Sequence, residues 1–293
     1  MTSPASIDTI DHIMIAVKDL AQAEQDYTKL LGRVPSWRAT HEGMNMAHII
    51  YRLANTYLEL MTPHGAGGFG DKIQAHLDEK GEGLFGIAFG TNDVAGVTAK
   101  LQEKGLTAST PAQRNGISDD GLERIWVNTY LPTAETRGLF VFITQPEDRL
   151  AIPYSPVSTG VSGRAAIEAV DHIVINTAEP DAAISFFRDE LGLRLALDQT
   201  IEKWDVRQLF FRIGNMTLEI VTPQKKKRSA HEDDFFWGHA FLCPDIQAYC
   251  DRFSADGGTV SDIRTGRKPG TLVATAKSGT LNIPTLLIGT QAQ

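Results

Sequence analysis

The sequence predicts an α+β protein built from four modules, each with the order strand, helix, strand, strand, strand. The first observation is a repeated pair of motifs. Asp-His-Ile occurs at 11–13 and 171–173, and a Leu-Glu that leads into Thr-Pro occurs at 58–63 and 218–223. Both motifs recur after 160 residues. One offset shared by two separate motifs indicates a duplication of about half the chain.

The second observation is that each half divides again. An apolar run at 84–89 leads into a helical pattern at 93–105, and a similar run at 237–242 leads into one at 245–258. Apolar residues recur at helical spacing in both patterns, for example Val94, Val97 and Leu101 in the first. Glycines end both patterns, as they do at helix C-termini.

The remaining elements complete the modules. Helices are predicted at 19–31 and 180–191, strands at 34–39, 47–53, 193–199 and 206–213, and a loop after each Thr-Pro. The predicted modules are 8–63, 81–146, 168–223 and 235–290. They pair into an N-terminal domain over 1–150 and a C-terminal domain over 165–293, joined by the turn-rich segment 153–160.

Composition narrows the class of protein. The chain has 293 residues and a net charge of −8, which argues against a nucleic-acid partner. No run approaches the roughly 20 apolar residues of a membrane span, and the N-terminus does not look like a signal peptide. Cys243 and Cys250 are expected to be reduced thiols in a cytoplasmic protein, and the basic run 225–228 to be a solvated loop. A small molecule is the expected partner, and a homodimer is left open.

Several of these segments resemble the vicinal-oxygen-chelate superfamily, which includes glyoxalase I, methylmalonyl-CoA epimerase, extradiol dioxygenases and bleomycin-resistance proteins. The segments 11–20, 58–60 and 80–89 look epimerase-like, and Trp-Gly-His-Ala-Phe at 237–241 looks glyoxalase-like. The resemblance implies that two modules form one cupped sheet. It also implies that metal ligands come from the first and last strands of each module.

Carried over by position, the resemblance gives a C-terminal metal site of His172, Glu219 and His239, with Leu286 at the fourth position. Two histidines and a carboxylate suit Fe, Mn, Zn or a similar divalent ion. The N-terminal half offers His12 and Glu59, but its other two positions fall at Gly86 and about Phe142. We therefore expect any metal in the C-terminal domain and none in the N-terminal one.

A second pairing of modules stays open. If the first module pairs with the fourth, the site becomes His12, Glu59 and His239; pairing of sequence neighbours is favoured. Strand alternation places Trp237 and Phe241 on the face of His239 as pocket-lining residues. No role is assigned to the remaining histidines or to two exposed-looking carboxylates: His41, His48, His64, His76, His231, Glu42 and Glu202.

Three functions follow from the resemblance. The first is a metal-dependent glyoxalase-like enzyme of the lyase or isomerase type, acting on a small oxygen-chelating substrate. Its catalytic residues are not identified, and Leu286 stands where relatives that transfer protons carry a carboxylate. The second is an extradiol-type ring-cleaving dioxygenase. The third is a metal-free protein that binds and sequesters a small molecule.

Overall fold

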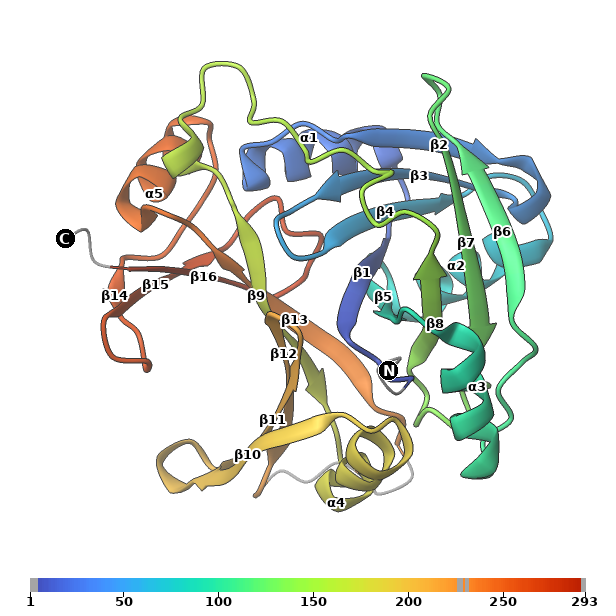
Figure 1. Ribbon diagram of the computed structural model, residues 1–293. Coiled ribbons are helices and arrows are strands. Elements are labelled where there is room, and N and C mark those ends of the chain that lie inside the picture. Colours follow the sequence, from blue (N-terminus) through green and yellow to red (C-terminus); the bar gives the residue numbers. More distant parts are fainter. Residues whose placement is uncertain (1–4, 226–228, 230–231, 291–293) are drawn as a thin grey trace.

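Two eight-stranded sheets organise the chain, one in each half (Figure 1). The computed structural model describes residues 5–225, 229 and 232–290. The strand orders are β2-β3-β4-β1-β5-β8-β7-β6 and β10-β11-β12-β9-β13-β16-β15-β14. Each sheet therefore joins two modules that are neighbours in sequence, which confirms the favoured pairing and excludes a sheet shared by the first and fourth modules.

The N-terminal half follows the predicted module order with one addition. Its elements are β1 (Thr9–Ala16), α1 (Leu20–Leu31), β2 (Trp37–His41), the 3-10 turn η1 (Glu42–Met44), β3 (Met46–Arg52), β4 (Tyr57–Pro63), α2 (Gly68–Lys80), β5 (Gly83–Gly90), α3 (Val94–Glu103), β6 (Ala112–Ile117), β7 (Glu123–Tyr130) and β8 (Phe140–Pro146). The Asp19 side chain accepts a hydrogen bond from the backbone N–H of Gln22 and so begins α1. Gly32, at φ 65°, ends it.

The C-terminal half repeats this order. Its elements are η2 (Gly163–Ala165), β9 (Ala169–Asn176), α4 (Pro180–Ile184), η3 (Ser185–Glu190), β10 (Arg194–Ile201), η4 (Glu202–Trp204), β11 (Val206–Ile213), β12 (Met216–Pro223), β13 (Phe235–Leu242), α5 (Ile246–Ala255), β14 (Arg264–Thr265), β15 (Thr271–Ala276) and β16 (Thr285–Thr290). The helix predicted at 180–191 is α-helical only in its first part and continues as the π-helix η3.

Helix α2 is the addition, and the sequence analysis predicted a loop there. Phe69, Ile73 and Leu77 recur every four residues, and the last two are buried against the sheet. The helix packs mainly on β4. Gly70 permits this approach, because a Cβ at that position would lie 2.1 Å from the carbonyl oxygen of Asn45. The segment after β12 has no described helix, so α2 distinguishes the two halves.

One hydrophobic core runs through both halves. The buried Tyr249 hydroxyl on α5 donates to the carbonyl oxygen of Leu30 on α1, at 2.7 Å. Arg137 forms an ion pair of 2.7 Å with the buried Asp234. The predicted linker is mostly exposed, but its Ser155 is fully buried and the backbone N–H of Ser155 donates to the carbonyl oxygen of Arg52. The two halves therefore form one continuous body.

Two other expectations can be compared with the structure. Cys243 and Cys250 form no disulfide, as predicted, and both are buried. Among the described helices, none combines the length and apolarity that a membrane crossing needs. Residues 226–228 of the basic run lie outside the described residues.

Candidate active site

A cavity of about 320 Å³ opens on the concave face of the N-terminal sheet; we call it the N-terminal cavity. Its wall is partly polar, with His12, His41, His48 and Glu59, and partly apolar, with methionines and aromatic rings. Gly68, Phe69 and Lys72 of α2, which packs on this sheet, also line it. The helix absent from the prediction thus completes the cavity.

Strand register explains which side chains share this face. His12 pairs across the sheet with Tyr57 on β4 and with Ala88 on β5, and Ala88 pairs in turn with Phe142 on β8. Two residues further along β1, Met14 pairs with Glu59 and with Gly86. Alternation along each strand therefore presents His12 and Glu59 to the same face. A Cβ at Gly86 would lie 2.4 Å from the carbonyl oxygen of Phe140.

Glu59 lies at the centre of a buried polar network. The His48 Nδ1–H donates to one of its oxygens. The His12 Nε2 lies 3.5 Å from the other. All three residues are at most 6% exposed. Burial alone raises the pKa of Glu59, but the charge and hydrogen bond of His48 and the charge of His12 outweigh it and hold that pKa well below its usual range.

Two further contacts extend the network. The His12 Nδ1 lies 2.8 Å from Asp11 Oδ1, and the His48 Nε2 lies 3.1 Å from the His41 Nε2. A carboxylate only accepts hydrogen bonds, so the proton of neutral His12 lies on Nδ1 and its Nε2 carries the lone pair. Burial, and then the charge of His48, lowers the pKa of His41 to about 4.

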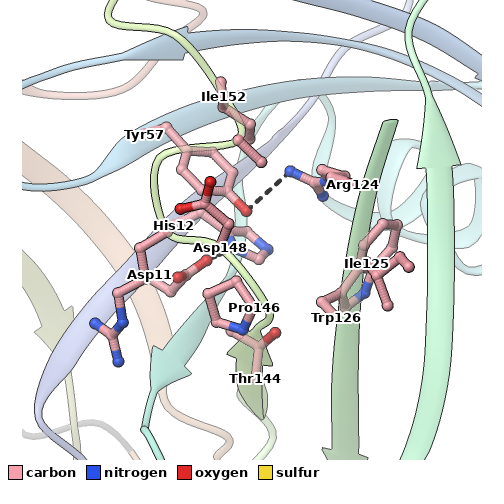
Figure 2. Close-up of a pocket in the computed structure, with 12 residues that line it drawn as sticks. Asp11, His12, Tyr57, Arg124, Ile125, Trp126, Thr144, Pro146, Asp148 and Ile152 are labelled. Atoms are coloured by element: carbon pink, nitrogen blue, oxygen red, sulfur yellow. Dashed lines mark hydrogen bonds and ion pairs between the residues drawn. The ribbon is translucent and has the colours of Figure 1, made fainter. Parts of the chain in front are cut away.

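A smaller chamber lies behind His12 (Figure 2). It has a volume of about 40 Å³ and shares His12, Tyr57 and Arg124 with the surroundings of the network. The His12 ring stacks on Tyr57 with a centroid distance of 4.7 Å. The Arg124 Nη1 donates to the Tyr57 hydroxyl at 3.3 Å, which is a long hydrogen bond. His12, Arg124 and Trp126 line both this chamber and the N-terminal cavity.

The C-terminal half brings together two of its three predicted ligands. The His172 Nε2 lies 3.5 Å from Glu219 Oε2, and its Nδ1 lies 2.7 Å from Asp171. Gln208 stands where the first half has His48, and its amide donates to Glu219 Oε1 at 2.5 Å. Burial raises the pKa of Glu219, whereas at Glu59 the neighbouring histidines outweigh burial and the pKa is lowered. The duplicated carboxylates therefore sit in different electrostatic environments.

His239 does not join this pair, and its predicted place in the triad needs correction. It pairs with Ile173 on β9, whereas His172 pairs with Ala240. His239 therefore faces the helix-covered core, where its ring contacts Phe241 at 4.4 Å and its Nε2 lies 3.0 Å from the Thr285 hydroxyl. Burial, and then the charge of His172, lowers the pKa of His239 to about 3.

The cause is a register slip of one residue in the sequence comparison. Gly238, not His239, pairs with Val174 as Gly86 pairs with Met14. A slip of one residue moves a side chain to the other face of a sheet. The shared pattern Gly-X-Ala-Phe, at 86–89 and 238–241, is the signal in the sequence that gives the correct register.

The other predicted residues also take definite places. Phe241 is fully buried in the main core and Trp237 is 51% exposed, so neither lines the N-terminal cavity. His41 and His48, to which the sequence analysis gave no role, do line it. His64 and Glu42 are exposed and lie 3.9 Å apart. His76 contacts the Phe85 ring, Glu202 begins η4, and His231 lies outside the described residues.

Comparisons with known proteins agree with this architecture. The family model described as "Glyoxalase-like domain" matches residues 10–165, and the one described as "Glyoxalase/Bleomycin resistance protein/Dioxygenase superfamily" matches residues 169–282. The chain therefore belongs to the glyoxalase-like family, as a tandem member of the vicinal-oxygen-chelate superfamily. Among curated protein sequences, none matches the chain.

Solved structures share the fold at low sequence identity. A mutant of 4-hydroxymandelate synthase from Streptomyces coelicolor has a TM-score of 0.71 at 15% identity, over 98% of this chain and 94% of that one. The Mn(II)-bound glyoxalase from Novosphingobium aromaticivorans has a TM-score of 0.61 at 13% identity, over 97% and 83%. A hypothetical protein from Staphylococcus aureus has a TM-score of 0.63 at 13% identity, over 96% and 99%.

The expected divalent metal can be tested against the residues present. The strand pairings place His12, Glu59, Ala88 and Phe142 at the four ligand positions of the first half. In the second half they place His172, Glu219, Ala240 and Leu286 there. Two positions in each half thus lack a donor. Among the described residues, no three His, Cys, Asp or Glu side chains are grouped to hold a metal ion. The described residues at these positions therefore do not fit a resident divalent ion.

Proposed function

We propose that this chain is a glyoxalase-like enzyme of the lyase or isomerase type, whose working site is the N-terminal cavity. There it transfers a proton on a small, partly apolar substrate that carries oxygen. The observation that supports the proposal is the buried Glu59 held between His12 and His48 at the cavity wall. Burying a carboxylate is costly, and a network of titratable groups in a concave site is typical of acid–base chemistry.

His12 is the group we assign as general base. Asp11 holds its Nδ1–H, so the Nε2 lone pair is directed away from Asp11. The 3.5 Å separation from Glu59 is too long for a strong hydrogen bond, which leaves this nitrogen able to take a proton from a bound molecule. Glu59 then stabilises the imidazolium that forms.

His48 has a supporting role. Its Nδ1–H donates to Glu59, and its Nε2 contacts the half-buried His41. The two imidazoles share one proton across this 3.1 Å contact, because a hydrogen bond between ring nitrogens needs one donor and one acceptor. His48 thus keeps the Glu59 carboxylate oriented toward His12.

Metal-free binding of a small molecule is the second candidate function. The cavity wall includes Met14, Met44, Met46 and Met61, and flexible methionines accommodate apolar ligands of varied shape. Binding without turnover would favour this candidate. No described feature favours ring-cleaving dioxygenase activity over proton transfer.

The test is proton exchange in deuterated water. The purified protein is incubated with small oxo acids, hydroxy ketones and their neutral esters, and NMR follows deuterium entry at the carbon beside the carbonyl. His12→Asn and Glu59→Gln are compared with the duplicated positions, His172→Asn and Glu219→Gln. General acid–base catalysis contributes about 10²–10⁴-fold, so the first pair should lose exchange by at least about 100-fold. The second pair should retain it. If only the second pair loses exchange, the working site lies in the C-terminal half and the proposal is wrong.

A further inference from the structure

Among the described residues, the side chain of Arg124 on β7 forms no ion pair, although the charges of Tyr57, Glu59 and Asp11 act on it and, against the cost of burial, raise its pKa. Among the described residues, no carboxylate comes within 4.0 Å of its guanidinium. Within the described part of the chain, its one side-chain hydrogen bond runs from Nη1 to the Tyr57 hydroxyl, and its buried Nε has no partner. Some other arginines pair with carboxylates, as Arg137 does with Asp234 and Arg207 with Asp198, and others donate to backbone carbonyls, as Arg33 does to Ile167 and Ser155. Arg124 therefore keeps most of its donors unused.

Aromatic rings hold this guanidinium in place. It lies 4.4 Å from the ring centroid of Trp126, 5.5 Å from that of Trp37 and 5.7 Å from that of Tyr57. Such rings stabilise a cation without consuming its N–H donors in their plane. The guanidinium is thus fixed in position and available to an acceptor in the cavity.

The charges around the cavity favour an anion. The lining contains three permanent cations, Lys72, Arg114 and Arg124, and one carboxylate, Glu59. The oxygens of Glu59 already face His12 and His48. The protein as a whole has a net charge of −8, so the positive charge of this lining is opposite in sign to the net charge of the chain. A concave surface of one sign concentrates ligands of the other.

We propose that the N-terminal cavity takes a small monocarboxylate, with its carboxylate on Arg124 and its apolar part against the methionines and phenylalanines. A planar guanidinium matches a carboxylate with two parallel hydrogen bonds. The cavity has one cation in its interior, while Lys72 and Arg114 are exposed at its edge. One interior charge suits a monoanion better than a doubly charged phosphate ester. This inference names the substrate class of the proposed enzyme and rests on the same cavity.

Calorimetric titration of isosteric pairs tests it. The probes are phenylacetate with phenylacetamide, and hexanoate with hexanamide. Phenyl phosphate is the dianionic comparison. A charge-assisted pair of hydrogen bonds corresponds to about 10- to 100-fold in affinity. The wild-type protein should therefore bind each amide, and phenyl phosphate, at least tenfold more weakly than the matching carboxylate. Equal affinity for acid and amide, or tighter binding of phenyl phosphate, would overturn the inference without any variant being made.

Variants add a matched control. Arg124→Met should weaken carboxylate binding by about 10- to 100-fold and leave amide binding unchanged, and Arg124→Lys should recover part of the loss. Arg267 in the other half also stacks on a tryptophan, Trp204, at 4.4 Å, but it donates to Gln208. Arg267→Met should leave carboxylate binding unchanged. Carboxylate affinity that Arg124→Met does not alter, or that Arg267→Met lowers equally, would contradict the assignment.

Two outcomes separate this inference from the proposed function. Glu59→Gln should still bind phenylacetate, because the carboxylate is assigned to Arg124 and not to Glu59. Arg124-dependent carboxylate binding without proton exchange on any compound would refute the enzyme and keep the substrate class. Exchange on neutral compounds that depends on Glu59, with no preference for acids, would support the enzyme and refute the monocarboxylate substrate class.

Discussion

Glu59 and Glu219 occupy the same position in the two halves, yet replacing each with glutamine should affect stability differently. The Glu59 pKa is lowered, because hydrogen bonding and charge from His48 and charge from His12 exceed the cost of burial. The Glu219 pKa is raised, because burial dominates. The ionised form is therefore favoured by folding at Glu59 and disfavoured at Glu219.

The magnitudes follow from the interactions that each substitution removes. Glu59→Gln removes a buried charge that faces two imidazoles, and breaking such a buried pair costs about 2–4 kcal/mol at pH 7. Glu219→Gln removes a charge that burial opposes, while the Gln208 amide still finds an acceptor. Its effect should stay within about 1 kcal/mol of wild type, with either sign.

Urea unfolding at several pH values measures both effects. A carboxylate with a lowered native pKa contributes stability that is fully present above its unfolded pKa of about 4.3 and is lost as pH falls toward the native pKa. The difference between wild type and Glu59→Gln should therefore be largest near neutral pH and shrink below about pH 4. Equal losses in the two variants at pH 7, or a loss below about 1 kcal/mol for Glu59→Gln, would refute the electrostatic asymmetry.

Three further predictions concern other parts of the chain. His239→Ile places isoleucine at the position that matches Ile87 in the N-terminal half. Because the His239 pKa is lowered to about 3, this variant should match wild type at pH 7.5 and gain roughly 2 kcal/mol at pH 5 in urea unfolding; no gain would contradict it. Gly70→Ala should displace α2 from Asn45 and lower stability by about 1–3 kcal/mol, whereas Gly43→Ala, with open space around its Cβ, should not. Protein incubated with Fe(II), Mn(II) or Zn(II) and desalted should retain far less than one ion per chain by elemental analysis; one tightly held ion would restore the metal-dependent interpretation.

The fold was predictable because its signals are local or repeated. The 160-residue offset, the helical spacing in α3 and the capping residues each fix an element without reference to distant parts. Helix α2 carries the same kind of signal in Phe69, Ile73 and Leu77. The glycines at 65, 67, 68 and 70 favour a loop at the start of this segment, and they conceal the helical spacing of these three residues.

The site was only partly predictable, because it depends on register. The repeated motifs identify His12 and Glu59. In β13, register shifts lie on both sides of Gly238–Ala240. They conceal the one-residue difference because of which the His239 side chain faces the core. His48 was missed because it pairs with Met61 and reaches Glu59 only diagonally. Such a contact requires knowledge of which strands are neighbours.

The choice of half is the central claim, and one comparison tests it most directly. Solvent deuterium exchange is measured on the same substrate panel with wild type, Glu59→Gln and Glu219→Gln prepared side by side. The N-terminal cavity as working site predicts exchange by wild type and Glu219→Gln, and a loss of at least about 100-fold in Glu59→Gln. Full exchange by Glu59→Gln together with its loss in Glu219→Gln would contradict that claim.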